Sequence, residues 1–167
     1  MKNNKKILIA YYSHSGNTKF IAETMSKEVG ADLIELTPKK KLNASGIGYF
    51  GWGIRQLVRK DDREIEEIPF NVEDYDLIII GTPVWTYTLT PPVRTFLKEN
   101  NFKGRTVGVF CCHEGDYSNT LEDMVEHMPE SNCIGKIDFM GVLKDNKTDS
   151  ANRAKQWIRT LCDSLVE

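Results

Sequence analysis

A polar segment of six residues follows the first apolar run of the chain and has the composition of an anion site. It reads Ser13-His-Ser-Gly-Asn-Thr18 and leads directly into a stretch with helical periodicity. The first turn of a helix offers unpaired backbone N–H groups and a partial positive charge, and hydroxyl side chains add further donors. Gly16 lets the backbone approach a ligand closely. The segment therefore predicts a phosphate site, with a helix cap built from polar turn residues as the alternative.

The residues of this segment narrow the kind of phosphate compound. No Lys follows in the manner of Gly-Lys-Ser/Thr, and the segment is not a G-x-G-x-x-G. A nucleoside triphosphate and a Rossmann-type dinucleotide are therefore poorly supported as ligands of this segment. We expect a phosphate monoester that is bound without a counter-cation.

A second segment places large aromatic rings in a polar loop directly after an apolar run. Trp85 and Tyr87 would expose much apolar surface there unless a planar group covers them, and ring stacking contributes about 0.5 to 1.5 kcal/mol beyond burial. Packing of Trp85 beneath the following helix is the alternative. The loop has no glycine between Pro83 and Pro91. Because β-branched and bulky residues are poor at positive φ, we expect the loop to avoid a turn of that geometry.

A third segment, Cys111-Cys-His-Glu-Gly-Asp-Tyr117, follows another apolar run. Gly115 marks a turn that brings Tyr117 and backbone amides to the edge that the other two segments share. A Cys-His-Glu metal site is disfavoured, because adjacent residues rarely converge on one ion. His113 has no spaced partner that resembles a nucleophile dyad. We expect neither a metal nor a catalytic side chain.

The rest of the chain indicates how these segments are positioned. Apolar runs of strand length alternate with stretches in which apolar residues recur at helical spacing. Ser15, the Pro91-Pro92 pair, Ser118 and Asp149 are the start signals of four helices. The run at 77–80 is apolar without alternation, as in a parallel strand covered on both faces. We expect a doubly wound α/β sandwich with a five-stranded parallel sheet, whose strands include residues 7–12, 33–36, 77–80, 107–112 and 137–142.

One excursion interrupts this alternation between residues 38 and 72. It holds Lys39-Lys-Lys41, a glycine and aromatic run at 46–53, and an apolar helical face at 54–58 beside several arginines. We interpret it as one helix with a glycine-rich lead-in. No repeat or low-complexity run appears, so residues 1–167 are expected to form a single domain that the excursion decorates.

Composition sets the class and the compartment. The chain has 167 residues, of which 40% are hydrophobic and 28% charged, with a formal net charge of −2, as in ordinary globular domains. The first 64 residues are net basic and the remainder net acidic, which indicates a polarised surface and not a nucleic-acid binder. The four cysteines form no C-x-x-C pair, and the favoured interpretation is buried free thiols. The apolar runs are too short for an export signal or a membrane span, so we expect a cytoplasmic protein.

These three segments together resemble the flavodoxin family, whose members bind FMN non-covalently. The resemblance covers essentially the whole chain and implies a flavodoxin-like sandwich. By resemblance, Ser13-His-Ser-Gly-Asn-Thr18 is the phosphate loop, Thr82-Pro-Val-Trp-Thr-Tyr87 the first flavin loop and Cys112-His-Glu-Gly-Asp-Tyr117 the second. The implied cofactor-binding residues are Ser13, His14, Ser15, Gly16, Asn17, Thr18, Thr82, Pro83, Val84, Trp85, Thr86, Tyr87, Cys112, His113, Glu114, Gly115 and Tyr117.

The resemblance also implies a role for each group. The hydroxyls of the phosphate loop, the Asn17 side chain and the amides of His14 and Gly16 would hold the phosphate. Trp85 or Tyr87 would stack on one face of the flavin and Tyr117 on the other, while the amides of His113 to Gly115 would meet its pyrimidine edge.

Three functions are compatible with these residues. The leading one is FMN-dependent electron transfer with redox partner proteins, in which the chain tunes a flavin and needs no catalytic side chain. The alternative is an FMN-dependent oxidoreductase acting on a small molecule such as a quinone. Its substrate pocket would use Tyr49, Phe50 and Trp52, with Arg55, Arg59 or Arg63 attracting an anionic substrate. A flavin-free binding or scaffold module would leave the hydroxyl-rich loop and the loop aromatics without a use.

Overall fold

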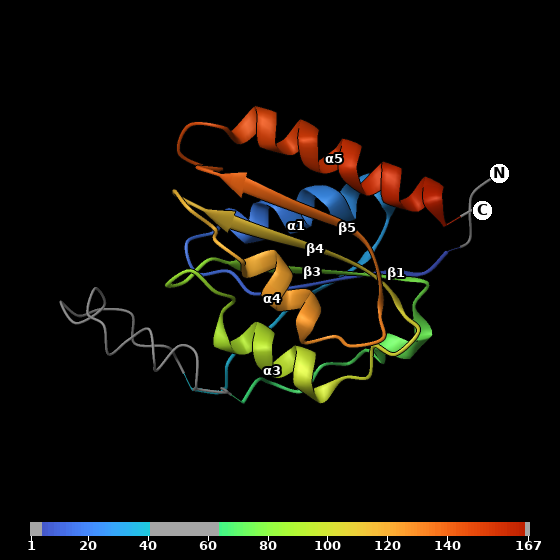
Figure 1. Ribbon diagram of the computed structural model, residues 1–167. Coiled ribbons are helices and arrows are strands. Elements are labelled where there is room, and N and C mark those ends of the chain that lie inside the picture. The colour runs from blue at the N-terminus through green and yellow to red at the C-terminus, as the bar shows by residue number, and fades with distance from the viewer. Residues whose placement is uncertain (1–4, 41–63, 166–167) are drawn as a thin grey trace.

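The computed structural model describes residues 5–40 and 64–165. In these residues five parallel strands form one sheet in the order β2-β1-β3-β4-β5. Figure 1 shows helices α1 and α5 on one face of this sheet and α3 and α4 on the other. The strands are β1 (Ile7–Tyr11), β2 (Asp32–Glu35), β3 (Leu77–Pro83), β4 (Thr106–His113) and β5 (Asn132–Met140), and the helices are α1 (Asn17–Val29), α3 (Pro91–Glu99), α4 (Thr120–Glu126) and α5 (Lys147–Ser164). The expected five-stranded α/β sandwich is confirmed.

Two hydrophobic layers hold the helices to the sheet. Alternate residues of the central strands point to opposite faces, as the pleat requires. On β3, Ile78 and Ile80 pack with the residues of α3 and α4, whereas Leu77 and Ile79 pack with those of α1 and α5. This double coverage explains why the β3 sequence is apolar without alternation. Burial on both faces therefore stabilises the central strands, and the loops at the strand ends are left free to carry polar residues.

The helix starts differ from the expected ones in three of four cases. Pro91 and Pro92 do open α3. Helix α1 is preceded by Gly16 in place of Ser15, at a φ of 91°, and α4 follows Asn119 because Ser118 lies in the left-handed region with a φ of 48°. Helix α5 starts at Lys147, before Asp149. At α1 and α4 a residue in the left-handed region, Gly16 or Ser118, lies just before the helix.

The two ends of the excursion lie side by side. Pro38 forms an antiparallel bridge with Ile65, and the amide of Lys39 donates to the Glu64 carbonyl at 2.9 Å. Ile65 is buried in the hydrophobic layer beneath α3. The 3-10 turn at Val72–Asp74 then leads into β3. The helix expected at 54–63 and the basic and aromatic residues beside it lie outside the described residues.

A substitution at Gly81 on β3 tests how tightly the central strands β3 and β4 pack. A Cβ atom there would lie 2.1 Å from Cζ of Phe110, a fully buried ring on β4. We expect Gly81→Ala to lower the free energy of unfolding of the FMN-free protein by about 1 to 3 kcal/mol in urea titrations, because overpacking a rigid core forces strain. Gly115→Ala is the matched control, since nothing lies within 4 Å of its Cβ position. Equal stability of the two variants would contradict this account of the core.

Candidate functional site

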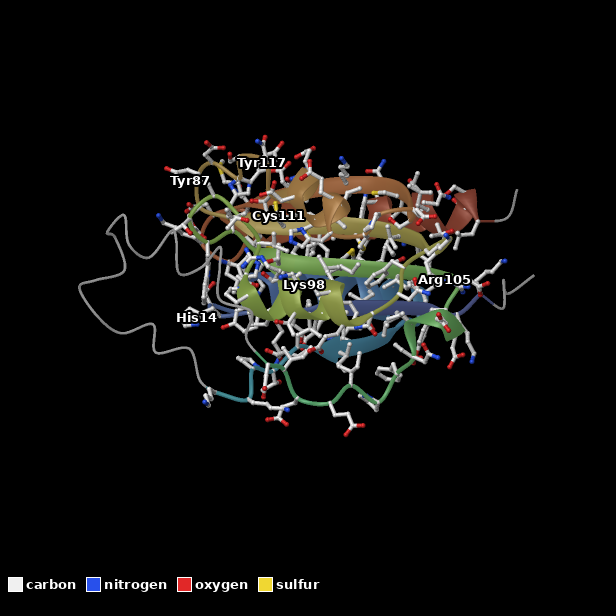
Figure 2. All side chains as sticks on the ribbon, turned by 60° about the horizontal axis from the view of Figure 1, so that its bottom comes forward. His14, Tyr87, Lys98, Arg105, Cys111 and Tyr117 are labelled. Atoms are coloured by element: carbon white, nitrogen blue, oxygen red, sulfur yellow. The ribbon has the colours of Figure 1, made fainter. Side chains whose placement is uncertain are left out.

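Three loops meet at the carboxyl edge of the sheet. Figure 2 shows His14, Tyr87 and Tyr117, which come from the loops after β1, β3 and β4, at one end of the molecule, and Arg105 at the other end. Backbone bonds join the loops at their bases. The amide of Tyr12 donates to the Gly81 carbonyl at 3.2 Å, and that of Val84 donates to the Cys112 carbonyl at 3.0 Å. The three predicted segments therefore border one site.

The loop after β1 holds the start of α1 open toward this edge. Gly16 has a φ of 91° and makes no side-chain cap. The Ser13 hydroxyl oxygen accepts a hydrogen bond from the Lys19 amide at 3.2 Å, so Ser13, and not Ser15, satisfies a first-turn N–H of the helix. Ser15 is exposed. An anion at this helix start would meet backbone N–H groups and the partial positive charge of α1.

The Asn17 side chain ties three loops together. Its amide nitrogen lies 3.2 Å from the Ser15 hydroxyl and 3.2 Å from a Glu114 carboxylate oxygen, and its oxygen accepts from the Leu143 amide at 3.0 Å. Leu143 belongs to the loop between β5 and α5, which the sequence analysis did not include in the site. Asn17 was expected to hold phosphate, and in this structure it joins the phosphate loop to the second flavin loop.

The loop after β3 contains a strained two-residue turn. Trp85 and Thr88 exchange backbone hydrogen bonds of 3.0 and 3.1 Å, and the residues between them, Thr86 and Tyr87, have φ values of 47° and 64°. Positive φ at both central positions is the type I′ geometry, which favours Asn and Gly. The expectation that this loop avoids positive φ is wrong. The pair of backbone bonds and the anchored ends of the loop force the conformation on two unfavourable residues.

The base of this loop is fixed by buried hydroxyl groups. Thr82 Oγ1 accepts from the Thr90 amide at 3.1 Å and lies 3.1 Å from the Thr90 hydroxyl, and both residues are fully buried. Pro83 and Val84, which follow, are half-buried. Thr82 therefore shapes the loop from beneath, and its hydroxyl is already used within the loop.

The two aromatic rings of the loop lie in different surroundings. The Trp85 ring is half-buried and meets the Tyr12 and His14 rings edge-on, with centroids 5.8 and 5.6 Å away. Tyr87 at the tip of the turn is 51% exposed. The ring contacts of Trp85 are thus with the loop after β1 and not with the following helix that the alternative named, whereas Tyr87 is the more exposed of the two rings.

The loop after β4 brings together a histidine, a carboxylate and a tyrosine. His113 Nε2 lies 2.9 Å from Asp138 Oδ2 on β5, and the His113 and Tyr117 ring centroids are 5.2 Å apart. The Tyr117 carbonyl accepts from both the amide and the hydroxyl of Thr120. Glu114 and Gly115 at the tip are exposed, and Cys112 is buried beneath them. Asp138 is a site residue that the sequence analysis missed, although an aspartate inside the apolar run 137–142 was a signal for it.

Three buried polar atoms at this edge have no nitrogen or oxygen hydrogen-bond partner among the described residues. They are Thr18 Oγ1 in the first turn of α1, Thr86 Oγ1 in the loop after β3 and His113 Nδ1 at the end of β4. A buried polar group without a partner costs about 1 to 3 kcal/mol, and such groups are rare in folded proteins. Their placement at one edge, each in or beside one of the three loops, fits a site whose polar groups are completed by a bound cofactor.

Comparison with known proteins agrees with this geometry. The sequence pattern of the family described as Flavodoxin matches residues 6–161. The chain belongs to the flavodoxin family. It is 22% identical to Flavodoxin 1 of Escherichia coli strain K12 over 188 aligned positions that cover 94% of this chain and 93% of the relative.

Solved structures are similar over the same range. A protein from Bacteroides eggerthii DSM 20697 superposes with a TM-score of 0.75 and 23% identity, covering 98% of this chain and 99% of the other. A flavoprotein from Lactobacillus acidophilus NCFM, solved in complex with FMN, has a TM-score of 0.63 and 27% identity, and covers 89% of this chain and 99% of its own. With the family established, FMN is the cofactor, as the resemblance to this family implied.

The thiols near the site are protonated, and no metal cluster is found among the described residues. All four cysteines are free, Cys111 and Cys112 buried and Cys133 and Cys162 half-buried, so the prediction of buried thiols holds for two of them. Burial raises the pKa of Cys112 to about 12 and also raises that of Cys111, which keeps both as unreactive thiols. Within residues 5–40 and 64–165, no three His, Cys, Asp or Glu side chains gather as a metal site would require.

Among the helices within residues 5–40 and 64–165, none has both the length and the apolar character that a membrane span requires.

Because the turn is strained, we predict that a glycine in it stabilises the protein. We expect Thr86→Gly to raise the free energy of unfolding of the FMN-free protein by at least about 1 kcal/mol in urea titrations. The change removes a left-handed β-branched residue, worth about 1 to 2 kcal/mol, and a buried hydroxyl without a partner, against a glycine entropy cost of about 0.5 to 1 kcal/mol.

The matched control lies two residues further along the same loop. Thr88 has no positive φ, and its hydroxyl donates to the Asp123 carboxylate at 3.3 Å. Thr88→Gly should therefore destabilise the protein by about 1 kcal/mol or more. If both variants lose stability, the strain assigned to Thr86 is not present in solution.

Proposed function

We propose that this chain is an FMN-dependent electron-transfer protein of the flavodoxin type, which exchanges electrons with partner proteins. One observation carries the proposal of a protein partner. The large exposed hydrophobic side chains of the described residues are Tyr87, Met140 and Leu143, and all three lie at the carboxyl edge, where the cofactor loops are. We call these three residues the apolar rim. Apolar side chains gathered around a site favour contact with another protein.

The phosphate of FMN would lie at the start of α1. The donors available to it are the backbone amides of His14, Gly16 and Asn17 and the hydroxyls of Ser13, Ser15 and Thr18. Thr18 is the most specific of these, because its buried hydroxyl has no nitrogen or oxygen partner among the described residues and contacts only the weakly hydrogen-bonding Cys112 thiol. A phosphate oxygen would complete it, and the partial charge of the helix would add to the attraction.

The flavin ring would lie between the loops after β3 and β4. Tyr87 is the favoured stacking residue, because its ring is exposed while the Trp85 ring already packs against Tyr12 and His14. Tyr117, half-buried beside His113, would border the opposite face. When bound, FMN supplies the electron-accepting ring, and the protein supplies its binding, orientation and electrostatic surroundings. Of the site residues predicted from the sequence, none needs to act as a catalyst.

The phosphate loop predicts a preference for FMN over riboflavin. We expect Thr18→Val to weaken FMN binding by about 10- to 150-fold, because a charge-assisted hydrogen bond contributes about 1.5 to 3 kcal/mol. Riboflavin binding should stay unchanged, since riboflavin lacks the phosphate. Quenching of flavin fluorescence on titration of the FMN-free protein measures both affinities.

Two further measurements make this test specific. Thr18→Val should change the stability of the FMN-free protein little, since the lost hydroxyl contacts only the weakly hydrogen-bonding Cys112 thiol there. Thr160→Val, on the exposed face of α5, is the control that should leave both affinities unchanged. Equal affinities of the natural chain for FMN and riboflavin would place the phosphate elsewhere.

The choice between a carrier and an oxidoreductase can be tested with the FMN-loaded protein. A carrier should consume NAD(P)H with a quinone no faster than free FMN at the same concentration. After reduction by dithionite, it should transfer electrons to a haem protein such as cytochrome c in a stopped-flow experiment. Saturable quinone turnover with NAD(P)H would instead favour the oxidoreductase, whose expected pocket residues at 49–63 lie outside the described residues.

A cytoplasmic location, redox partner proteins and a single domain over residues 1–167 stay predictions. The carrier proposal needs a compartment in which a reduced flavin and free thiols persist, and four free cysteines are compatible with that.

A further inference from the structure

The His113 side chain is paired at one ring nitrogen and unpaired at the other. Nε2 lies 2.9 Å from Asp138 Oδ2, and only 5% of the His113 side chain is exposed. Nδ1 is buried and has no hydrogen-bond partner in the part of the chain that the structure describes. Because a carboxylate only accepts hydrogen bonds, Nε2 carries the proton of the neutral ring and Nδ1 is left as a bare acceptor. The ring can therefore take up a second proton without losing its bond to Asp138.

The position of His113 places this acceptor within the cofactor site. It is the last residue of β4, and its carbonyl accepts from the Gly141 amide at 2.9 Å. Its ring lies beside that of Tyr117 in the second flavin loop. The residue before it, Cys112, is bonded through its carbonyl to Val84 of the first flavin loop. His113 is thus anchored next to the two loops that would border the flavin, so a charge on its ring would lie close to the cofactor.

Charged groups of both signs lie on the elements around this position. Asp138 on β5 is in direct contact, Glu114 is the next residue in the loop, and α4 contributes Asp123. Glu122 on α4 is paired with Lys136 on β5 at 3.5 Å. Arg153 on α5 donates to the Asp138 carbonyl, so Arg153 and Lys136 are the two cations among these groups. Asp138 is 34% exposed, which gives solvent a route to the pair.

We propose that His113 and Asp138 form a proton-accepting pair that takes up a proton when the bound cofactor is reduced. The inference rests on the proposed FMN-dependent function. Two electrons come from an external reductant such as dithionite or a reduced redox protein, and the proton comes from solvent and joins Nδ1. No covalent bond to the cofactor forms or breaks. The resulting imidazolium ring is balanced by Asp138 on one side and by the negative charge that reduction adds to the site.

Nitrogen NMR of the FMN-loaded protein tests this directly. With ¹⁵N-labelled histidine, Nδ1 of His113 should resonate as an unprotonated ring nitrogen in the oxidised protein near neutral pH. After reduction by dithionite under anaerobic conditions, both ring nitrogens should resonate as protonated. Assignment comes from His113→Gln, and His127, whose Nδ1 bonds to the Asp123 carbonyl, is the internal control that should not change. An unchanged His113 ring on reduction overturns the proposal.

The pH dependence of the two-electron reduction potential is the second measurement. One extra proton per two electrons makes the slope steeper by up to about 30 mV per pH unit, since a tenfold change in proton concentration corresponds to that potential. Asp138→Asn keeps the shape of the residue and removes its charge, so it should give a shallower slope than the natural chain. His127→Gln should give the natural slope. An Asp138→Asn slope equal to the natural one contradicts the proposed pair.

The two measurements separate this inference from the proposed function. If the protein does not bind FMN, the proposed function fails and the histidine spectra cannot be compared between redox states. If FMN binds and transfers electrons while the His113 ring stays neutral in both states, only the proton-accepting pair is wrong.

Discussion

The parallel pairing of β1 with β3 is the constraint on which the site depends. The chain reverses its direction of winding between these strands, so the loops that follow them leave the sheet on opposite sides of one crevice. The pairing is held by residues such as Ile9 and Ile79, which are fully buried between two helical layers. No polar residue of the loops is needed to maintain it. The loops are therefore free to keep polar groups that the protein itself does not satisfy.

The cost of such groups is visible in the first flavin loop. Thr86 and Tyr87 both occupy the left-handed region, at about 1 to 3 kcal/mol each, and the Thr86 hydroxyl is buried without a partner among the described residues. Conflicts between local preference and the folded structure are expected where function requires them. Here the buried hydroxyl bonds between Thr82 and Thr90 hold the base of the loop and so maintain the strained turn. The turn keeps the Tyr87 ring exposed, where a planar ligand or a partner can cover it.

The fold could be predicted from the sequence because burial leaves a periodic pattern. The apolar run at 77–80 and the helical spacing at 93–97 both correspond to observed elements, β3 and α3. The three loops were located correctly because parallel strands place their carboxyl ends together. The side-chain contacts were not predictable in the same way. Asp138 is far from His113 in sequence, and only the register of β4 against β5 brings their side chains into contact. The turn at Thr86 was predicted wrongly because residue preference was outweighed by the anchored ends of the loop.

Charged groups and apolar side chains are expected to contribute differently to the recognition of a partner protein. Lys19 is paired with Glu35 at 3.1 Å, Glu122 is paired with Lys136, and the whole chain carries a formal net charge of only −2. Paired surface charges in a nearly neutral chain provide little long-range steering of a partner. Short-range contact with the apolar rim therefore carries more of the recognition under the proposed function. Met140 of this rim is the register partner of His113, so a protein that covers the rim also covers the strand ends that hold the proton-accepting pair. Water excluded by such a contact would strengthen the electrostatic interaction between His113, Asp138 and the reduced cofactor, because charges interact more strongly where the dielectric constant is low.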